Sequence, residues 1–237
     1  MTEELLAGGH DSGPVSRVGN TVRRPVRPWT RSVHALLRHL EAVGFTAAPR
    51  VIGVEESGQR EILTYVHGSD GRTARCYDDE ALAEVAGRIR ELHRAAAGFQ
   101  PPPDARWRPD PYAPPGPLVC HNDLGPANTI YRDGKPRAFI DWDFATPTTA
   151  VWDLGYAVRS FVPLYAPADC VAMGYPPDRQ AERLRLFCDA YGMDRPTREA
   201  LLPAVRARLD AQSSAFTDRT KQTLTDHWQD WSRSLTI

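Results

Sequence analysis

Three polar residues stand close together around the segment CHNDLGPANTI, which spans residues 120–130. Asp123 is followed five positions later by Asn128, and a second carboxylate, Asp141, comes directly after the next apolar run. Strands usually avoid Asp and Asn, because these side chains compete with the backbone for hydrogen bonds. Their presence beside apolar runs therefore indicates a chemical role rather than a structural one.

These residue types fit phosphoryl transfer. The reaction needs a carboxylate that orients and deprotonates the attacking hydroxyl, oxygen ligands for Mg²⁺, and cationic groups around the phosphates. Asp123 and Asn128 have the spacing of a protein-kinase catalytic loop, H-R-D-x-x-x-x-N, with His121 two positions before the aspartate. A hairpin over 129–141, with an Asp-Gly turn, would return the chain and place Asp141 near Asn128.

The elements that must position these residues fall into two parts. Residues 15–67 follow the order strand, strand, helix, strand, strand, which predicts a small α+β unit with its helix starting at Thr30. After residue 77 the apolar spacing is mostly helical, interrupted by a Pro-rich loop and by the hairpin that carries the motif. We expect the loop over 101–117 and helices over 78–98 and, roughly, 151–161, 178–191, 197–214 and 218–234.

Composition excludes several other classes of protein. The 237 residues suffice for one large domain or two lobes, and 29 Lys and Arg against 30 Asp and Glu leave a formal charge of −1. This balance argues against a broad basic surface for nucleic acid. The four cysteines lie far apart, as expected for free thiols, and no run approaches the roughly 18 apolar residues of a membrane span. With no signal-like N-terminus, we expect a cytoplasmic protein without membrane or nucleic-acid partners.

The stretch HNDLGPANTIYRDGKPRAFIDWDFATPTTAVWDLGYA, residues 121–157, resembles the aminoglycoside phosphotransferase and choline kinase-like family. The resemblance implies an α+β, two-lobed, protein-kinase-like fold. A small β-rich N-terminal lobe over 1–66 would bind the nucleotide, and a larger helical C-terminal lobe over 67–237 would hold the catalytic loop and the acceptor. It also implies a kinase that transfers the γ-phosphoryl group of Mg·ATP (GTP stays open) to a hydroxyl of a small molecule, with an aminoglycoside-type antibiotic as one acceptor.

Carried over residue by residue, the resemblance implies a role for each member of the motif. Asp123 would be the catalytic base, and His121 would support the shape of its loop. Asn128 and Asp141 would hold Mg²⁺ between the nucleotide phosphates. Taken alone, each Asp could equally be a turn or cap residue, but the combination favours the functional interpretation.

Two further carboxylates are less defined. Asp153 is expected to anchor the loop or to cap the next helix rather than to touch substrate. Asp143 has three alternatives, since it could face the metal, the substrate or solvent.

The nucleotide-binding part departs from the family pattern. Arg23 stands where the family usually has a lysine, with Arg24 as an alternative one residue on. The helix position that normally supplies the glutamate partner corresponds to Val33, so we expect the lysine–glutamate ion pair to be absent. Of the expected Gly-rich loop over 8–15 only the last Gly-x-Val matches, and a plain surface turn is the alternative.

Other features of the nucleotide and acceptor sites rest on position alone. Thr64, Tyr65 and Val66 are the candidates for backbone contacts with the nucleotide base, because their strand leads into the hinge between the lobes. Acidic residues would suit a cationic aminoglycoside, but residues 178–219 are rich in arginine. Arginine that alternates with acidic residues on helices is usually a solvated face, which is the favoured interpretation here. Neither the acceptor nor the oligomeric state can be read from the sequence.

Two alternatives to an active kinase remain. A non-catalytic kinase-like protein that binds a nucleotide or metabolite would explain the altered glycine loop and missing ion pair. A metal-dependent hydrolase that uses Asp141 and Asp143 would leave Asp123 and Asn128 without a role.

Overall fold

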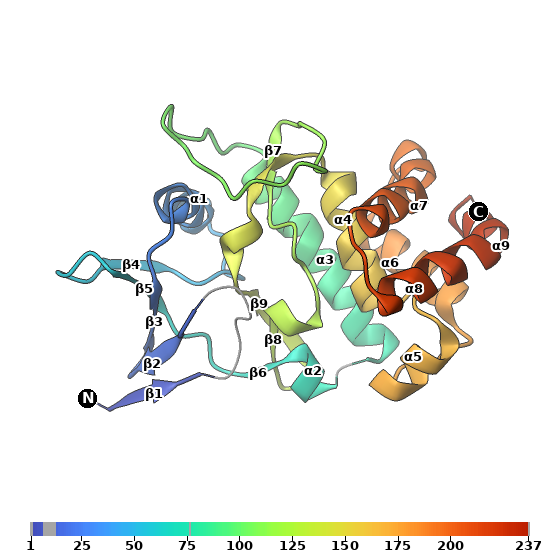
Figure 1. The fold of residues 1–237 in the computed structure, drawn as a ribbon, viewed down its shortest axis with the longest axis horizontal. Helices are drawn as coiled ribbons and strands as arrows, with labels where there is room; N and C mark the ends of the chain where they lie inside the picture. Colours follow the sequence, from blue (N-terminus) through green and yellow to red (C-terminus); the bar gives the residue numbers. More distant parts are fainter. Residues whose placement is uncertain (1, 7–12, 76, 237) are drawn as a thin grey trace.

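The computed structural model describes residues 2–6, 13–75 and 77–236 (Figure 1). Its first part is an antiparallel sheet of five strands in the order β1-β2-β3-β5-β4, with helix α1 beside it. The hairpin, helix and two further strands expected from the sequence are all present. The bounds are β1 Glu3–Leu5, β2 Ser16–Val18, β3 Thr21–Pro25, α1 Thr30–Ala42, β4 Val51–Val54 and β5 Arg60–Thr64.

Helix α1 is amphipathic. It buries Val33, Leu36, Leu37 and Leu40, whose spacing places them on one face of the helix. At its start, the Thr30 hydroxyl accepts a hydrogen bond from a backbone N–H of the preceding turn, at 2.8 Å. The apolar face thus fixes which side of α1 meets the protein.

A second, three-stranded sheet contains the hairpin that joins Asn128 to Asp141. It consists of β6 (Ser69–Asp70), β8 (Thr129–Arg132) and β9 (Lys135–Phe139), in the order β6-β8-β9. β8 and β9 form the expected hairpin, with Asp133 and Gly134 both at positive φ as a type I′ turn requires. A further antiparallel pair consists of β7 (Leu118–Cys120), which precedes His121, and β10 (Thr146–Thr148), which follows Asp143. Strands of two or three residues leave too little alternation for prediction from sequence, and β1, β6, β7 and β10 were not expected.

The C-terminal part is helical, which confirms the α+β class. α3 packs against α6, and α4 packs against α7. α5 was not expected, and the helix expected over 218–234 is two helices that meet at His227. The bounds are α2 Gly71–Ala74, α3 Asp79–Ala96, α4 Ala150–Phe161, α5 Pro167–Met173, α6 Gln180–Tyr191, α7 Arg195–Asp210, α8 Ala215–Asp226 and α9 Trp228–Leu235. In the described residues no helix combines the length and apolar character needed to cross a membrane.

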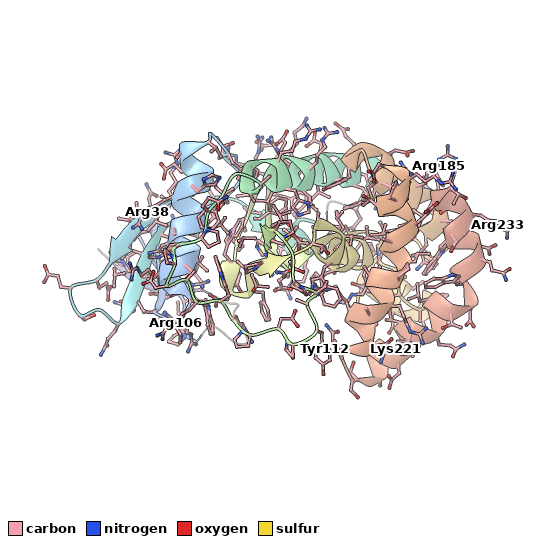
Figure 2. The ribbon with its side chains drawn as sticks, turned by 90° about the horizontal axis from the view of Figure 1, so that it is seen from above. Arg38, Arg106, Tyr112, Arg185, Lys221 and Arg233 are labelled. Atoms are coloured by element: carbon pink, nitrogen blue, oxygen red, sulfur yellow. The ribbon has the colours of Figure 1, made fainter. Side chains whose placement is uncertain are left out.

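The Pro-rich loop over 101–117 packs on the body of the protein as expected. Figure 2 shows it running along one face, with Arg106 near α1 and Tyr112 towards the C-terminal helices. Its backbone is tied down by a 2.7 Å hydrogen bond from the Arg106 N–H to Ser32, and Trp107 packs against the hydrophobic core. The cysteines at 120, 170 and 188 are buried and unpaired, while residue 76 lies outside the described residues.

Candidate active site

His121 ties the catalytic loop to the end of strand β9. Its Nε2 lies 3.0 Å from the carbonyl oxygen of Ile140, and its Nδ1 accepts a 3.3 Å hydrogen bond from the Asp123 N–H. Because Nδ1 accepts, Nε2 carries the proton and donates to Ile140. The ring also packs on Trp142, with centroids 4.6 Å apart. These contacts hold the loop against the end of β9.

Asp153 anchors the same loop from helix α4. Its Oδ1 accepts a 2.8 Å hydrogen bond from the N–H of Asn122, a residue in the left-handed region at φ 64°. Burial raises the pKa of Asp153, but the hydrogen bond from His93, 3.0 Å away, and the charges of His93, His121 and Arg208 together outweigh it, so the pKa lies below the usual aspartate value. Arg208 of α7 donates to the Asn122 carbonyl at 2.6 Å. Asp153 therefore contacts the loop backbone, as the sequence predicted.

Asp123 and Asn128 are in direct contact. The Asn128 amide donates to the Asp123 carboxylate at 2.8 Å and to the Asp123 carbonyl at 3.0 Å. Since Nδ2 makes both bonds, the amide oxygen Oδ1 is the atom of Asn128 that can bind a cation. Burial raises the pKa of Asp123, and the nearby charge of Asp141 adds to the rise, while a hydrogen bond from Tyr156 opposes it.

The hairpin brings Asp141 alongside this pair. The Ile140 N–H donates to the Asn128 carbonyl at 2.9 Å, which holds the end of β9 against the loop. Asp141 follows in the left-handed region, at φ 61°. The loop and the hairpin thus bring the Asn128 amide and the Asp141 carboxylate into one pocket lining near Asp123.

Asp141 and Asp143 differ in their surroundings. The Asp141 side chain is 28% exposed, whereas the Asp143 side chain is 4% exposed. Asp141 forms an ion pair with Arg24, with 3.1 Å between Oδ1 and Nη1. Asp143 accepts hydrogen bonds from the guanidinium of Arg24 and, at 3.1 Å, from the indole of Trp29. Asp143 is therefore buried against donors from the N-terminal part, and Asp141 is the carboxylate that remains open to a cation.

The two neighbouring arginines of β3 point to opposite faces of the sheet. Arg24 donates to Glu61 of β5 at 2.7 Å, and the other oxygen of Glu61 lies 2.6 Å from Nε2 of His34 on α1. Arg23 pairs instead with Glu55 at 2.9 Å. The structure thus brings Arg24 to the site and leaves Arg23 away from it, because successive residues of a strand face opposite sides. The helix position of Val33 offers no carboxylate, and the glutamate partner of Arg24 comes from strand β5, which the sequence did not predict.

A pocket of about 430 Å³ lies beside these residues. Arg24, Asn128 and Asp141 line it, so the charged residues from both parts of the chain meet at its wall. The expected hinge residues Thr64, Tyr65 and Val66 also line it, with apolar side chains Leu6, Val15, Val22, Leu63, Ile130 and Ile140. Of the expected Gly-rich loop, residues 8–12 lie outside the described residues, and Val15 contributes to the lining.

Several residues of this site were not assigned by the sequence analysis. Glu61, His34, Trp29 and Tyr156 all contact it, yet each comes from an element distant in sequence. The alternation of β5 offered one signal, because Glu61 is a buried carboxylate in an otherwise apolar strand face.

Comparison with known proteins agrees with this geometry. The phosphotransferase enzyme family matches residues 105–203, which include the catalytic loop and the hairpin. The trifolitoxin immunity protein of Rhizobium leguminosarum bv. trifolii is 36% identical over 205 residues, covering 84% of this chain and 77% of that protein. The chain belongs to the phosphotransferase enzyme family.

Solved structures of small-molecule kinases share the fold. A choline/ethanolamine kinase family protein from Mesorhizobium loti has a TM-score of 0.65 at 16% identity, covering 100% of this chain and 92% of that chain. The amicoumacin kinase hAmiN, solved with AMP-PNP, Ca²⁺ and Ami, has a TM-score of 0.69 at 11% identity, covering 96% and 88%. At these identities the similarity concerns the fold, which confirms the two-lobed kinase-like architecture.

Proposed function

We propose that this phosphotransferase moves the γ-phosphoryl group of Mg·ATP (GTP stays open) to a hydroxyl group of a small molecule. The observation that carries the proposal is the 2.8 Å contact between Asp123 and Asn128 at the pocket that Asn128 and Asp141 line. A base, an amide oxygen and an open carboxylate thus stand together at one end of a pocket of nucleotide size.

The reaction divides the work among the chain's own residues. Asp123 accepts the hydroxyl proton while the acceptor oxygen bonds to the γ-phosphorus and the bond to the β,γ-bridging oxygen breaks, so that ADP leaves. Asn128 and Tyr156 hold the Asp123 carboxylate by hydrogen bonds and so fix its orientation. The raised pKa makes this carboxylate a stronger base than an exposed aspartate.

The oxygen atoms of the site fit a divalent cation. The Asp141 side chain is 28% exposed, and it lines the pocket together with Asn128. Asn128 Oδ1 and the Asp141 carboxylate would hold Mg²⁺, which prefers such oxygen ligands. When bound, the ion would neutralise the charge of the nucleotide phosphates.

The nucleotide would occupy the pocket between the proposed lobes, 1–66 and 67–237. Apolar side chains from both parts of the chain suit a planar base. The Thr64 and Tyr65 N–H groups already donate to the carbonyls of Arg50 and Asn20 at 2.9 and 2.8 Å. Val66 is therefore the strongest candidate for a backbone contact with the base.

The biological setting is proposed from the relatives. One relative is named an immunity protein against trifolitoxin, and aminoglycoside phosphotransferases share the fold. Modification of a toxin or antibiotic hydroxyl is thus a candidate role, with aminoglycoside-type compounds among those to test.

A non-catalytic nucleotide- or metabolite-binding protein is the second candidate. The ion pair between Arg24 and Asp141 favours it, because the guanidinium holds one oxygen of the proposed metal ligand.

Two measurements separate these candidates. Thermal unfolding with and without Mg·ATP tests binding, since a ligand of the folded state raises Tm. ADP release is then measured over a panel of hydroxyl compounds that includes aminoglycosides, choline and sugars. Stabilisation with turnover supports the kinase, stabilisation without turnover supports the binding protein, and no stabilisation contradicts both as nucleotide binders.

A further inference from the structure

Two guanidinium groups lie against the same aromatic ring beside Asp123. Tyr156 of α4 hydrogen-bonds to the Asp123 carboxylate. Arg159, also on α4, and Arg208 of α7 each place their guanidinium carbon 4.9 Å from the centre of the Tyr156 ring. Two positive charges therefore contact the aromatic ring that is hydrogen-bonded to the proposed base.

These arginines differ from Arg183 and Arg219 of the helical part, which have carboxylate partners. Arg183 is buried and pairs with Asp79 at 2.5 Å, and the exposed Arg219 pairs with Asp169 at 2.7 Å. In the described ranges neither Arg159 nor Arg208 forms an ion pair with a carboxylate. Arg159 is only 8% exposed, yet its buried Nε has no hydrogen-bond partner among the described residues. Its Nη1 reaches only the side chain of Gln212, at 3.5 Å.

The surrounding charges do not compensate this pair. Burial lowers the pKa of Arg208, and the positive charge of Arg159 lowers it further. The carboxylates of Asp153 and Asp110 act on Arg208 from beyond ion-pair distance; Asp153 is hydrogen-bonded to His93, and Asp110 caps a turn. Burying a charge without a partner is unfavourable, and two like charges side by side add to the cost.

Part of the arrangement has a structural purpose. Arg208 donates to the carbonyls of Asn122 at 2.6 Å and Trp152 at 3.3 Å, which braces the catalytic loop. Arg159 makes no comparable contact with the loop, so bracing does not account for it. Tyr156 and Arg208 are partly exposed and Gln212 is exposed, so the edge of this group reaches solvent.

We propose that Arg159, Arg208 and Tyr156 form an acceptor subsite for an anionic oxygen group, either a carboxylate or a phosphate. The acceptor is then a hydroxyl compound with a negative charge near the hydroxyl that is phosphorylated. The guanidinium groups supply N–H donors and charge to the anion, as arginine does for carboxylates and phosphates. A polycationic acceptor would be repelled from the same place. The inference rests on the proposed function, because it assigns the acceptor side of that site.

The test uses three matched probes with the full chain. Glycerate, glycerol and serinol share a three-carbon hydroxyl skeleton and carry a negative, no and a positive charge. Thermal unfolding is followed during titration of each probe in saturating Mg·AMP-PNP, which fills the phosphate positions of the nucleotide pocket, and again without nucleotide. Glycerol 3-phosphate replaces glycerate in a fourth arm and separates phosphate from carboxylate recognition.

We expect glycerate or glycerol 3-phosphate to raise Tm while glycerol and serinol do not. Arg159→Gln should raise the half-saturating concentration of the anionic probe about tenfold, as expected for the loss of a charge-assisted contact. Arg159→Lys, which keeps the charge, should retain part of the effect if Arg159→Gln disturbs folding. Arg185→Gln is the control, because Arg185 is exposed on α6 at the far end of the helical part and pairs with Asp189 (Figure 2).

The outcomes decide the inference separately from the proposed function. Equal shifts for all three glycerol-type probes, no shift with either anion, or full anion binding by Arg159→Gln would overturn it. A failure of Mg·AMP-PNP to stabilise the wild-type protein would contradict the proposed function instead, and the titrations without nucleotide would still decide the anion subsite.

Discussion

Arg24 Nε lies 2.7 Å from Oε1 of Glu61, so the arginine that lines the pocket takes its carboxylate partner from a neighbouring strand. The second oxygen of Glu61 lies 2.6 Å from His34, and Arg24 also binds Asp143, which in turn accepts from Trp29. Trp29 directly precedes α1 and His34 lies within it. The contacts of Arg24 through Glu61 to His34, and through Asp143 to Trp29, therefore connect the start of α1 to the proposed metal site by two routes.

Glu61→Gln removes the charge that orients Arg24. We expect weaker binding of Mg·ATP, by about tenfold, since a charge-assisted hydrogen bond becomes a neutral one. Breaking a buried ion pair should also lower the free energy of unfolding by about 3 kcal/mol. Nucleotide titration and urea denaturation measure the two effects. Glu55→Gln is the matched control on the opposite face, where the Arg23 ion pair is more exposed, and an equal loss of nucleotide affinity there would refute the assignment.

Arg24 and Arg23 should respond differently to replacement by lysine. Arg24 donates to three carboxylates from one planar group, a geometry that a lysine ammonium cannot reproduce. Arg24→Lys should therefore reduce turnover by at least about tenfold, while Arg23→Lys should leave it nearly unchanged. Steady-state ADP release at saturating Mg²⁺ measures both. Equal losses of turnover in the two variants would show that the arginine facing the pocket is no more important for the reaction than the arginine on the opposite face of β3.

Asp123→Asn tests the proposed base. It preserves the shape of the side chain but removes its ability to accept a proton, so turnover should fall by about 10²–10⁴-fold. Binding of Mg·ATP should be largely retained, because Asn128 and Asp141 remain. Single-turnover kinetics and a nucleotide titration separate the two quantities. A variant with full turnover would exclude Asp123 as the base.

Asp153→Asn should destabilise the protein in a pH-dependent way. The folded-state pKa of Asp153 lies below the ordinary value of 3.8, so its ionised form stabilises the fold at any pH above that value. The stabilisation is lost as the pH falls through the lower, folded-state pKa. The wild-type protein should therefore exceed the variant in unfolding free energy at neutral pH, and the difference should narrow below about pH 4. Urea denaturation at a series of pH values measures this, and a difference independent of pH would contradict it.

The loop that holds Asp123 and Asn128 could be predicted because its geometry is local. Asp123 and Asn128 are five residues apart, and a hairpin with a recognisable turn returns Asp141 to them. The long apolar helices were predictable for the same reason, since their spacing is contained within one element. Breaks such as the one at His227 and strands of two or three residues leave no periodicity of their own.

The sequence by itself determined the phosphoryl-transfer motif, the α+β class and the family resemblance, because these depend on residue types at short spacing. The tertiary structure decided that Arg24 rather than Arg23 reaches the pocket, since a shift of one residue reverses the face of a strand. It also decided that Glu61, 37 residues from Arg24, is its partner, and that Asp143 is buried against Arg24 and Trp29. Contacts of this kind depend on the register and packing of separate elements, which no local spacing specifies.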